Sequence, residues 1–130
     1  MIFSIDKWEN NINKGDETLV KSDEDVFNNL KLLNGKTITQ LVANGKDNAL
    51  MIGGGNDKFV VTYIEGDNED FYNLINKDFP NSEEEIEVVT GGQAGLFPKS
   101  IVVDFNTTYF SLLYFFNHQK RNPNMEWKND

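Results

Sequence analysis

Two acidic residues have the apolar sequence neighbours that acid–base catalysis requires. Glu126 stands between Met125 and Trp127, and Asp104 follows the apolar residues 101–103. A hydrolytic pair needs two carboxyl groups at a fixed separation, one of them with a pKa raised by burial. An acid at the end of a strand is more commonly a cap or an ion-pair partner, so these two residues support only an alternative hypothesis.

In that alternative, the chain is a small enzyme or a ligand-binding domain that uses a glycine-rich loop. Gly91–Gly95 connects two strand-like runs, and a mobile connecting loop can form the edge of a binding site. Asp104 or Glu126 would then supply the carboxylate beside the bound ligand. The pattern is compatible with this chemistry and does not require it.

A second glycine run has a simpler interpretation. Gly53–Gly55 could cradle a phosphate only if it joined a strand to a helix N-terminus, usually with a lysine nearby. Strand-like segments flank it on both sides, and Asn56 and Asp57 follow it. We therefore predict a hairpin turn at residues 53–57.

The composition excludes several other chemistries. The chain has no cysteine and one histidine, His118, which rules out disulfides, thiolate zinc sites, iron–sulfur clusters and a cysteine nucleophile. His118 ends an aromatic segment, where a helix dipole favours a cationic side chain. No loop has the alternating oxygen ligands of a calcium site. We expect neither a metal nor another cofactor.

The acidic residues are concentrated in one segment. The chain carries 21 Asp and Glu against 12 Lys and Arg, a net charge of −9. Between residues 65 and 87 there are nine acids and a single lysine, Lys77, so this segment alone accounts for −8. Such a charge repels phosphate backbones and anionic lipids, which argues against nucleic-acid and membrane partners. It favours a basic partner or a solvated surface loop.

Aromatic residues lie within this acidic segment and strengthen the first of these interpretations. Aromatic side chains anchor protein interfaces, while a surrounding charge accelerates encounter with a partner of opposite sign. A charged segment also serves simply for solubility, and the sequence leaves both possibilities open. The candidate contact residues for a basic protein are Asp67, Glu69, Asp70, Phe71, Tyr72, Glu83, Glu84 and Glu85.

The length of the chain suits one domain that positions these residues. A domain of 130 residues buries roughly two-thirds of the surface of its unfolded chain, enough for its own core. The start of the chain lacks a basic and apolar leader pattern, and the longest apolar run, near residues 109–116, is too short to span a membrane. These features predict a cytoplasmic protein.

The first half of the chain predicts a helix followed by a meander of strands. Ser22 can cap a helix with three acids in its first turn, apolar residues recur at helical spacing to Leu33, and Asn34-Gly35 ends it. Strands are then predicted at residues 37–43, 49–52 and 58–64. The dipeptide Asn44-Gly45 is typical of the turn in a hairpin.

The second half is predicted to add further strands and a second helix. Residues 71–75 form either a strand or a helical turn, and strands are expected at residues 86–90 and 100–104. A helix capped by Asn106 or Thr107 should follow, through Phe116, with a short strand at residues 125–127. The whole is a single α+β domain, residues 1–130, in which two main helices pack on an antiparallel sheet of about five to seven strands.

The order of features in the second half resembles that of a known family. These features are a strand, a glycine-rich turn, Leu96-Phe97-Pro98, the strand at residues 101–104, an aromatic helix, Pro123 and Trp127. Residues 84–127 are in this respect similar to the deaminase-associated immunity family of bacterial polymorphic toxin and contact-dependent growth inhibition systems. The family pattern is hydrophobic, so it describes a scaffold more securely than an activity.

The resemblance implies a function without catalysis. Members are small, acidic, cytosolic α+β proteins, and each binds and blocks the toxin domain encoded beside it. The implied partner is the C-terminal domain of a cognate toxin, a basic nuclease or nucleic-acid deaminase. Pro123 and Trp127 would be fold residues, and the family supplies no contact residues. The oligomeric state stays open, and an acidic domain that assembles only with itself is a third possibility.

Overall fold

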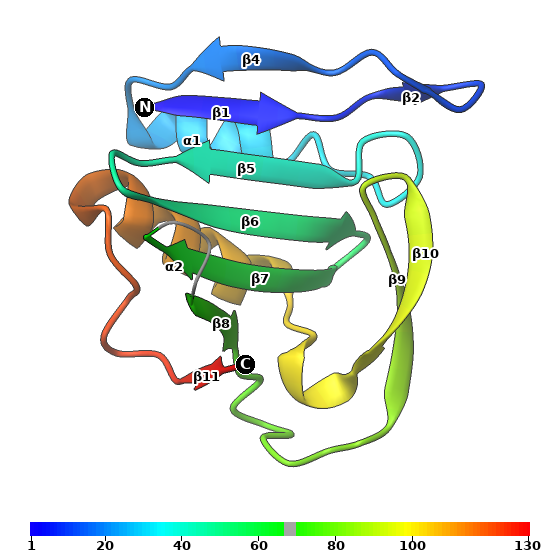
Figure 1. Cartoon of the computed structure of the whole chain (residues 1–130), viewed down its shortest axis with the longest axis vertical. Helices are drawn as coiled ribbons and strands as arrows, with labels where there is room; N and C mark the ends of the chain where they lie inside the picture. Colours follow the sequence, from blue (N-terminus) through cyan, green and yellow to red (C-terminus); the bar gives the residue numbers. More distant parts are fainter. Residues whose placement is uncertain (67–69) are drawn as a thin grey trace.

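The computed structural model describes residues 1–66 and 70–130. In this part of the chain, seven strands form one antiparallel sheet, and two helices cover one of its faces (Figure 1). The strands are β1 (Ile2–Ile5), β4 (Asp16–Leu19), β5 (Gln40–Asn44), β6 (Asn48–Gly55), β7 (Lys58–Glu65), β8 (Asp70–Leu74) and β11 (Trp127–Asn129). The predicted α+β class is confirmed.

The remaining elements are two small hairpins and three helical segments. They are β2 (Trp8–Glu9), β3 (Ile12–Asn13), β9 (Glu85–Thr90), β10 (Gln93–Pro98), α1 (Asp23–Leu30), the 3₁₀ turn η1 (Lys99–Ile101) and α2 (Phe105–His118). The sheet order is β11-β8-β7-β6-β5-β1-β4. Strands β5 to β7 thus form the predicted meander of three strands, and β8 extends it, because residues 71–75 lie largely in a strand.

Helix α1 has the N-terminal cap, the acidic first turn and the buried apolar side that its sequence predicted. The Ser22 hydroxyl accepts a hydrogen bond from the Asp25 N–H at 3.1 Å, and three acids occupy the first turn. Val26 and Leu30 are fully buried against the sheet. The ring of Phe27 packs edge-on against Tyr109 of α2, which joins the two helices.

The start of helix α2 differs from the prediction. Asp104, rather than Asn106 or Thr107, is the N-cap residue. The predicted strand at residues 100–104 was also wrong, because residues 99–101 form a 3₁₀ turn and only Val103 bridges to Phe59 of β7. The chain meets the sheet for one residue and then turns directly into the helix.

The glycine run at residues 53–55 is not a turn, so the hairpin turn predicted at residues 53–57 was wrong in its extent. These glycines are the last residues of β6, and the turn consists of Asn56 and Asp57, both at positive φ. The backbone packs too closely there for a side chain, since a Cβ at Gly55 would lie 2.1 Å from the Gly35 nitrogen. The glycines mark close packing within the core.

The hairpin of β9 and β10 lies across one end of the sheet (Figure 1). Only Gly91 and Gly92 form its turn, whereas Gln93–Gly95 belong to β10. Val88 of the hairpin packs with Val60 of β7 and with Val102 in a small second core. The hairpin therefore covers part of the sheet face that the helices leave open.

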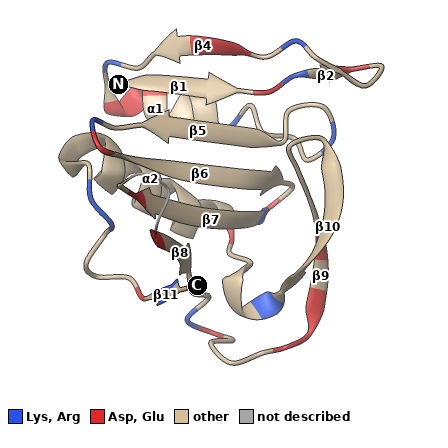
Figure 2. Ribbon diagram, in the orientation of Figure 1, with Lys and Arg blue, Asp and Glu red and all other residues tan. Residues whose placement is uncertain are grey.

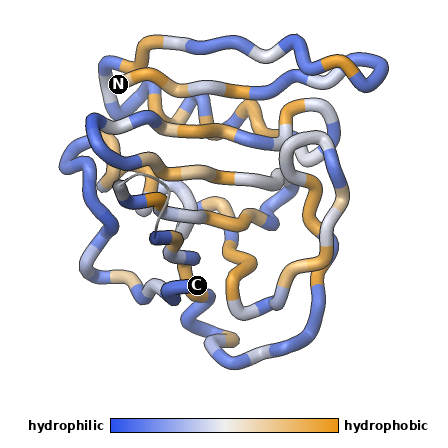
Figure 3. Tube along the Cα trace, viewed as in Figure 1, coloured by the Kyte–Doolittle hydropathy of each residue, from blue (hydrophilic) through white to orange (hydrophobic). Residues whose placement is uncertain are grey.

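The main core lies between the sheet and the helices. Alternate strand residues point toward the helices and are almost fully buried, as the period of a strand requires. The largest of them are Phe3, Leu41, Leu50, Ile52, Phe59 and Val61, which meet Leu112 and Phe115 of α2. Figure 3 shows the same division, with apolar colour along the central strands and polar colour in the connecting loops.

The segment before α1, to which no strands were assigned from the sequence, contributes two strands to the sheet. Strand β1 lies between β5 and β4 and pairs with both. The buried carboxylate of Asp6 connects its end to β5, accepting hydrogen bonds from the Thr39 N–H (2.7 Å), the Gln40 N–H (2.9 Å) and the Trp8 indole (2.7 Å). Among the described residues, no helix is long and apolar enough to cross a membrane.

Candidate functional site

The structure separates the acidic residues of the candidate contact surface into two groups. Asp70 begins β8 opposite Glu65, the last residue of β7. Glu83, Glu84 and Glu85 lie at the start of the β9–β10 hairpin, and Figure 2 shows the two groups at different edges of the molecule. Two further predicted contact residues, Asp67 and Glu69, lie outside the described residues.

The second acidic group has one cationic neighbour. Glu84 is 3.4 Å from the Lys99 ammonium, and its side chain is largely in solvent, whereas the Lys99 side chain is 28% exposed. Lys99 also lies over the ring of Phe79, with its nitrogen 3.8 Å from the ring centroid. An exposed ion pair of this kind contributes little to stability, about 1 kcal/mol at most. Glu83 and Glu85 are exposed beside it.

The two predicted aromatic anchors point to opposite faces of the sheet. Phe71 shares a face with Ile64, its partner on β7, and 37% of its surface is exposed. Tyr72 points to the helix side, where the guanidinium carbon of Arg121 lies 3.8 Å from its ring centroid. A partner that docks on one face of the sheet would therefore contact Phe71 and not Tyr72.

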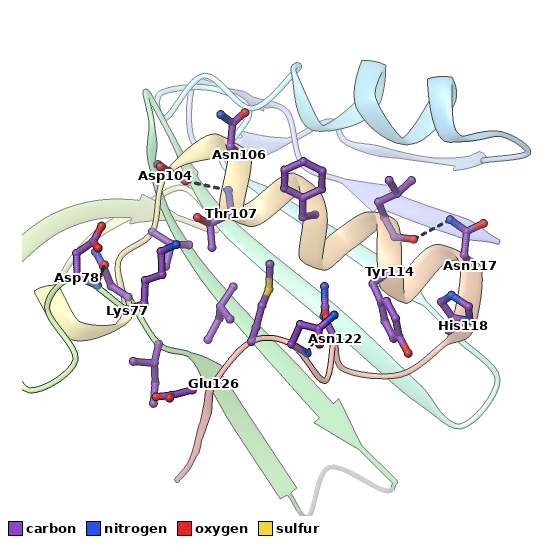
Figure 4. Close-up of a pocket in the computed structure, with 18 residues that line it drawn as sticks. Lys77, Asp78, Asp104, Asn106, Thr107, Tyr114, Asn117, His118, Asn122 and Glu126 are labelled. Atoms are coloured by element: carbon purple, nitrogen blue, oxygen red, sulfur yellow. Dashed lines mark hydrogen bonds between the residues drawn. The ribbon is translucent and has the colours of Figure 1, made fainter.

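A groove runs along α2 and has a volume of about 940 Å³ (Figure 4). Residues 74–78 and 122–126 form its other wall. Phe110 and Tyr114 line it from the helix at a spacing of four residues, and 55% of Phe110 is exposed. The His118 ring packs against Tyr114 at a centroid distance of 4.4 Å, in the last turn of the helix. We refer to this feature as the α2 groove.

Both acids of the enzymatic alternative line the α2 groove. Asp104 caps helix α2, because its carboxylate accepts a hydrogen bond from the Thr107 N–H at 2.8 Å. This hydrogen bond lowers the pKa of Asp104 below its ordinary value. A general acid needs a raised pKa, so the environment of Asp104 acts in the opposite direction. Glu126 is exposed, and its backbone carbonyl accepts a hydrogen bond from the Ile75 N–H.

The structure does not bring the Gly91–Gly95 loop to these carboxylates. The Gly92 N–H donates to the Thr39 hydroxyl at 2.9 Å, and a Cβ at Gly92 would lie 2.5 Å from the Trp8 ring. Trp8 and Thr39 lie at the other end of the molecule from β11, which follows Glu126 (Figure 1). The loop and the two acids therefore do not form a common site.

Sequence reasoning missed a second surface, the side of the sheet that faces away from the helices. We call it the open face. Its residues are directly opposed across the strands and form two rows. One row contains Leu19, Ile2, Asn44, Ala49, Ile64 and Phe71, and the other contains Glu17, Ser4, Val42, Met51, Thr62, Asn73 and Lys128. The alternation of residues within each of the strands β5 to β8 indicates which of them share a face. The order of the strands is needed to join these residues into rows.

The described residues thus offer two candidate sites, the α2 groove and the open face. No protein-family model and no curated protein sequence matches the chain. Neither surface contains a set of three or more His, Cys, Asp and Glu side chains arranged to hold a metal ion, within the described ranges. Shape and charge are the properties that distinguish the two surfaces.

Proposed function

We propose that this chain is an immunity protein, a cytoplasmic inhibitor that binds and neutralises one cognate toxin domain without catalysis. One observation carries the proposal. The acidic segment between Glu65 and Glu87 is largely exposed, and within its described residues only Glu84 has a cationic partner at ion-pair distance. Charge that is exposed and not neutralised within the molecule is available to a basic partner.

The charge suits a toxin that acts on nucleic acid. A nuclease or nucleic-acid deaminase must bind a polyanion, so its cleft is basic. An acidic inhibitor is attracted to the same cleft, which accelerates association and disfavours partners of the wrong sign. The chain itself would be repelled by nucleic acid for the same reason.

The arrangement of the second half also supports the proposal. The resemblance to the deaminase-associated immunity family was based on the order of a strand, a glycine turn, a strand at residues 101–104, an aromatic helix and a closing tryptophan. The strand at residues 101–104 is absent, since η1 and a single bridge at Val103 stand in its place. Strand β9, the Gly91-Gly92 turn, β10, α2 and β11 follow in this order. Trp127 packs against Tyr63 with a centroid distance of 6.5 Å, as a fold residue would.

Co-purification tests the proposal. The chain is expressed together with the C-terminal domain of the toxin encoded beside it, and only the toxin domain is tagged. We expect a complex of defined stoichiometry and loss of toxicity, and no complex with a toxin domain from an unrelated locus. Cells that stay poisoned, with the two proteins eluting separately, would contradict the proposal.

The volume of the α2 groove favours a second candidate, a domain that binds a small ligand there. A groove of about 940 Å³ is within the range of ligand sites. Thermal denaturation with nucleosides, monosaccharides and amino acids as probes tests this candidate. A probe that raises the melting temperature of the natural chain, but not of the Phe110→Ala variant, would support it. The absence of any such shift would remove it.

A further inference from the structure

The centre of the open face is nearly free of charge. Across β4, β1, β5, β6, β7 and β8, the row that ends at Phe71 contains only apolar residues and Asn44. Leu19 and Phe71 expose 54% and 37% of their surface, and the residues between them are half-buried or exposed. In a chain where a quarter of the residues are charged, an apolar row across six strands is an unusual surface.

Acidic residues flank this centre on two sides. Figures 1 and 2 look onto the open face, with the helices behind the sheet. Glu17 lies in the second row on the edge strand β4, and Glu83–Glu87 lie at the far end of the hairpin. Glu65 and Asp70, at the ends of β7 and β8, are one residue out of step with the two rows and belong to the helix side of the sheet. Lys58 on β7 and Lys128 on β11 are basic residues in the open-face register.

The open face also has a hollow near one corner. It has a volume of about 660 Å³ and lies between β1, β4, β5, Trp8 and the hairpin turn at Gly91. Three carboxylates line it, those of Asp6, Asp16 and Glu17, and no Lys or Arg is among its lining residues. Asp6 is occupied by hydrogen bonds within the fold, whereas Asp16 and Glu17 are exposed.

This arrangement matches the anatomy of a protein interface, in which charges are depleted at the centre and polar groups form the rim. We propose that the open face is the docking surface for the basic partner, and that a Lys or Arg side chain of the partner enters the hollow beside Asp16 and Glu17. The inference rests on the proposed function and specifies where the toxin domain binds. The acids of the rim then act on the rate of encounter, and the apolar row on the lifetime of the complex.

Charge makes a second copy of the chain a poor occupant of this surface. Each copy carries a net charge of −9, and two open faces brought together would oppose their acidic rims. Like charges placed opposite each other cost several kcal/mol at an interface. A basic partner instead neutralises the rim and fills the hollow.

Two methionines make the inference testable without altering the chain. Met51 lies on the open face, whereas Met125 lines the α2 groove behind the sheet. Carbon-13 labelled methionine methyl groups are observed by NMR while the toxin C-terminal domain is added. We expect the Met51 signal to shift or broaden and the Met125 signal to stay unchanged. A complex that perturbs Met125 alone, or neither methyl group, would overturn the inference.

A pair of matched variants provides an independent measurement. Val42→Lys places a cation at the hollow, while Phe110→Lys adds the same charge to α2 behind the sheet, where 55% of Phe110 is exposed. We expect Val42→Lys to raise the Kd of the complex by about 100-fold and Phe110→Lys to change it by about threefold or less. Circular dichroism and urea unfolding verify that both variants are folded.

The outcomes separate this inference from the proposed function. If the natural chain does not bind the toxin domain, the proposed function fails and the inference with it. If it binds, and Val42→Lys binds equally well, the inference is wrong while the proposed function stands. Light scattering that shows a dimer of the natural chain, dissociated by Val42→Lys, would assign the open face to a second copy and overturn the inference.

Discussion

Thr90 of the hairpin lies directly over Gly53 of the central strand β6, so closely that a Cβ at Gly53 would come within 2.5 Å of the Thr90 Cβ. Gly53 is not among the residues at positive φ, so its backbone conformation is open to other amino acids. The glycine is therefore required by contact and not by conformation. This contact holds the hairpin against the end of the open face.

We predict that Gly53→Ala lowers the free energy of unfolding by about 1–3 kcal/mol, because the hairpin must move away from the sheet to admit a methyl group. Urea unfolding measures the change. In a Thr90→Gly background the same substitution should cost less, since the contact atoms are then absent. Equal costs in the two backgrounds would show that another contact is responsible.

The glycine run shows why part of the fold could not be predicted from the sequence. Ser22 acts on its immediate neighbours, so the first helix followed from local rules. The first hairpin was also predicted, but its turn lies at residues 45–47, because Asn44 still pairs with Ala49 and neither Asn44 nor Gly45 is at positive φ. Gly53 and Gly55 instead fit against segments that are distant in sequence, at Thr90 and Gly35 respectively. Local reasoning interpreted their missing side chains as a turn.

The open face, like the fold, could be predicted from the sequence only in part. The charge of the segment 65–87 is a property of composition, and it places acids at the rim of the open face. The hollow near the hairpin depends on strand order, because Val42 and Glu17 become neighbours only when β1 enters between β5 and β4. No pattern within a single strand indicates this.

Asp6 should be among the least replaceable polar residues of the fold. We predict that Asp6→Asn lowers the free energy of unfolding by about 1–3 kcal/mol, because an NH2 group replaces Oδ2 and cannot accept the hydrogen bonds that the Trp8 indole and the Thr39 hydroxyl donate to it. Trp8 fluorescence during urea unfolding reports on the site. Exposed Asp16→Asn serves as the control, and an equal loss in both variants would contradict the prediction.

Removal of the Asp104 cap should weaken helix α2. We expect Asp104→Ala to lower the free energy of unfolding by about 1 kcal/mol, whereas Asp104→Ser, which retains a capping oxygen, should lose less. The hydrogen bond from the Thr107 N–H lowers the pKa of Asp104 in the folded protein. The contribution of ionised Asp104 to the stability of the folded protein is therefore complete above the ordinary pKa of 3.8. This contribution is lost as the pH falls through the lower pKa of the folded state.

The pH dependence provides the matching measurement. Unfolding of the natural protein and of Asp104→Ser is compared between about pH 2.5 and 6. The stability difference between them should shrink toward the acid end, because protonation removes the charged cap from the natural protein alone. A difference that stays constant over this range would contradict the assignment of the cap to the charged form.

Charge reversal at Glu83, Glu84 and Glu85 should slow the association of the chain with a toxin domain. We expect a decrease of about tenfold or more in the association rate constant at low salt, with a weaker dependence on ionic strength, because the rim attracts the partner over a distance. Stopped-flow fluorescence at several salt concentrations measures both quantities. The dissociation rate should change less.

A control for this experiment uses acids on the helix side of the sheet. Glu24 lies in the first turn of α1, and Glu126 lines the α2 groove. Reversal of both is compared with reversal of Glu83 and Glu85, which changes the net charge by the same amount. If the two double variants slow association equally, net charge alone is responsible and the hairpin acids have no special position.

The place of β1 in the sheet affects how the protein must form during synthesis. Strand β1 is made before both of its partners, yet it lies between β4 and β5, and its residue Ile2 pairs with both Leu19 and Asn44. At about 5–20 residues per second, the ribosome needs seconds to complete the second of these partners, and longer to release it. Until then β1 and β4 form at most a two-stranded ribbon with one open edge, which is marginally stable alone. Deletion of β1 would accordingly leave β4 without its partner and β5 as a new sheet edge.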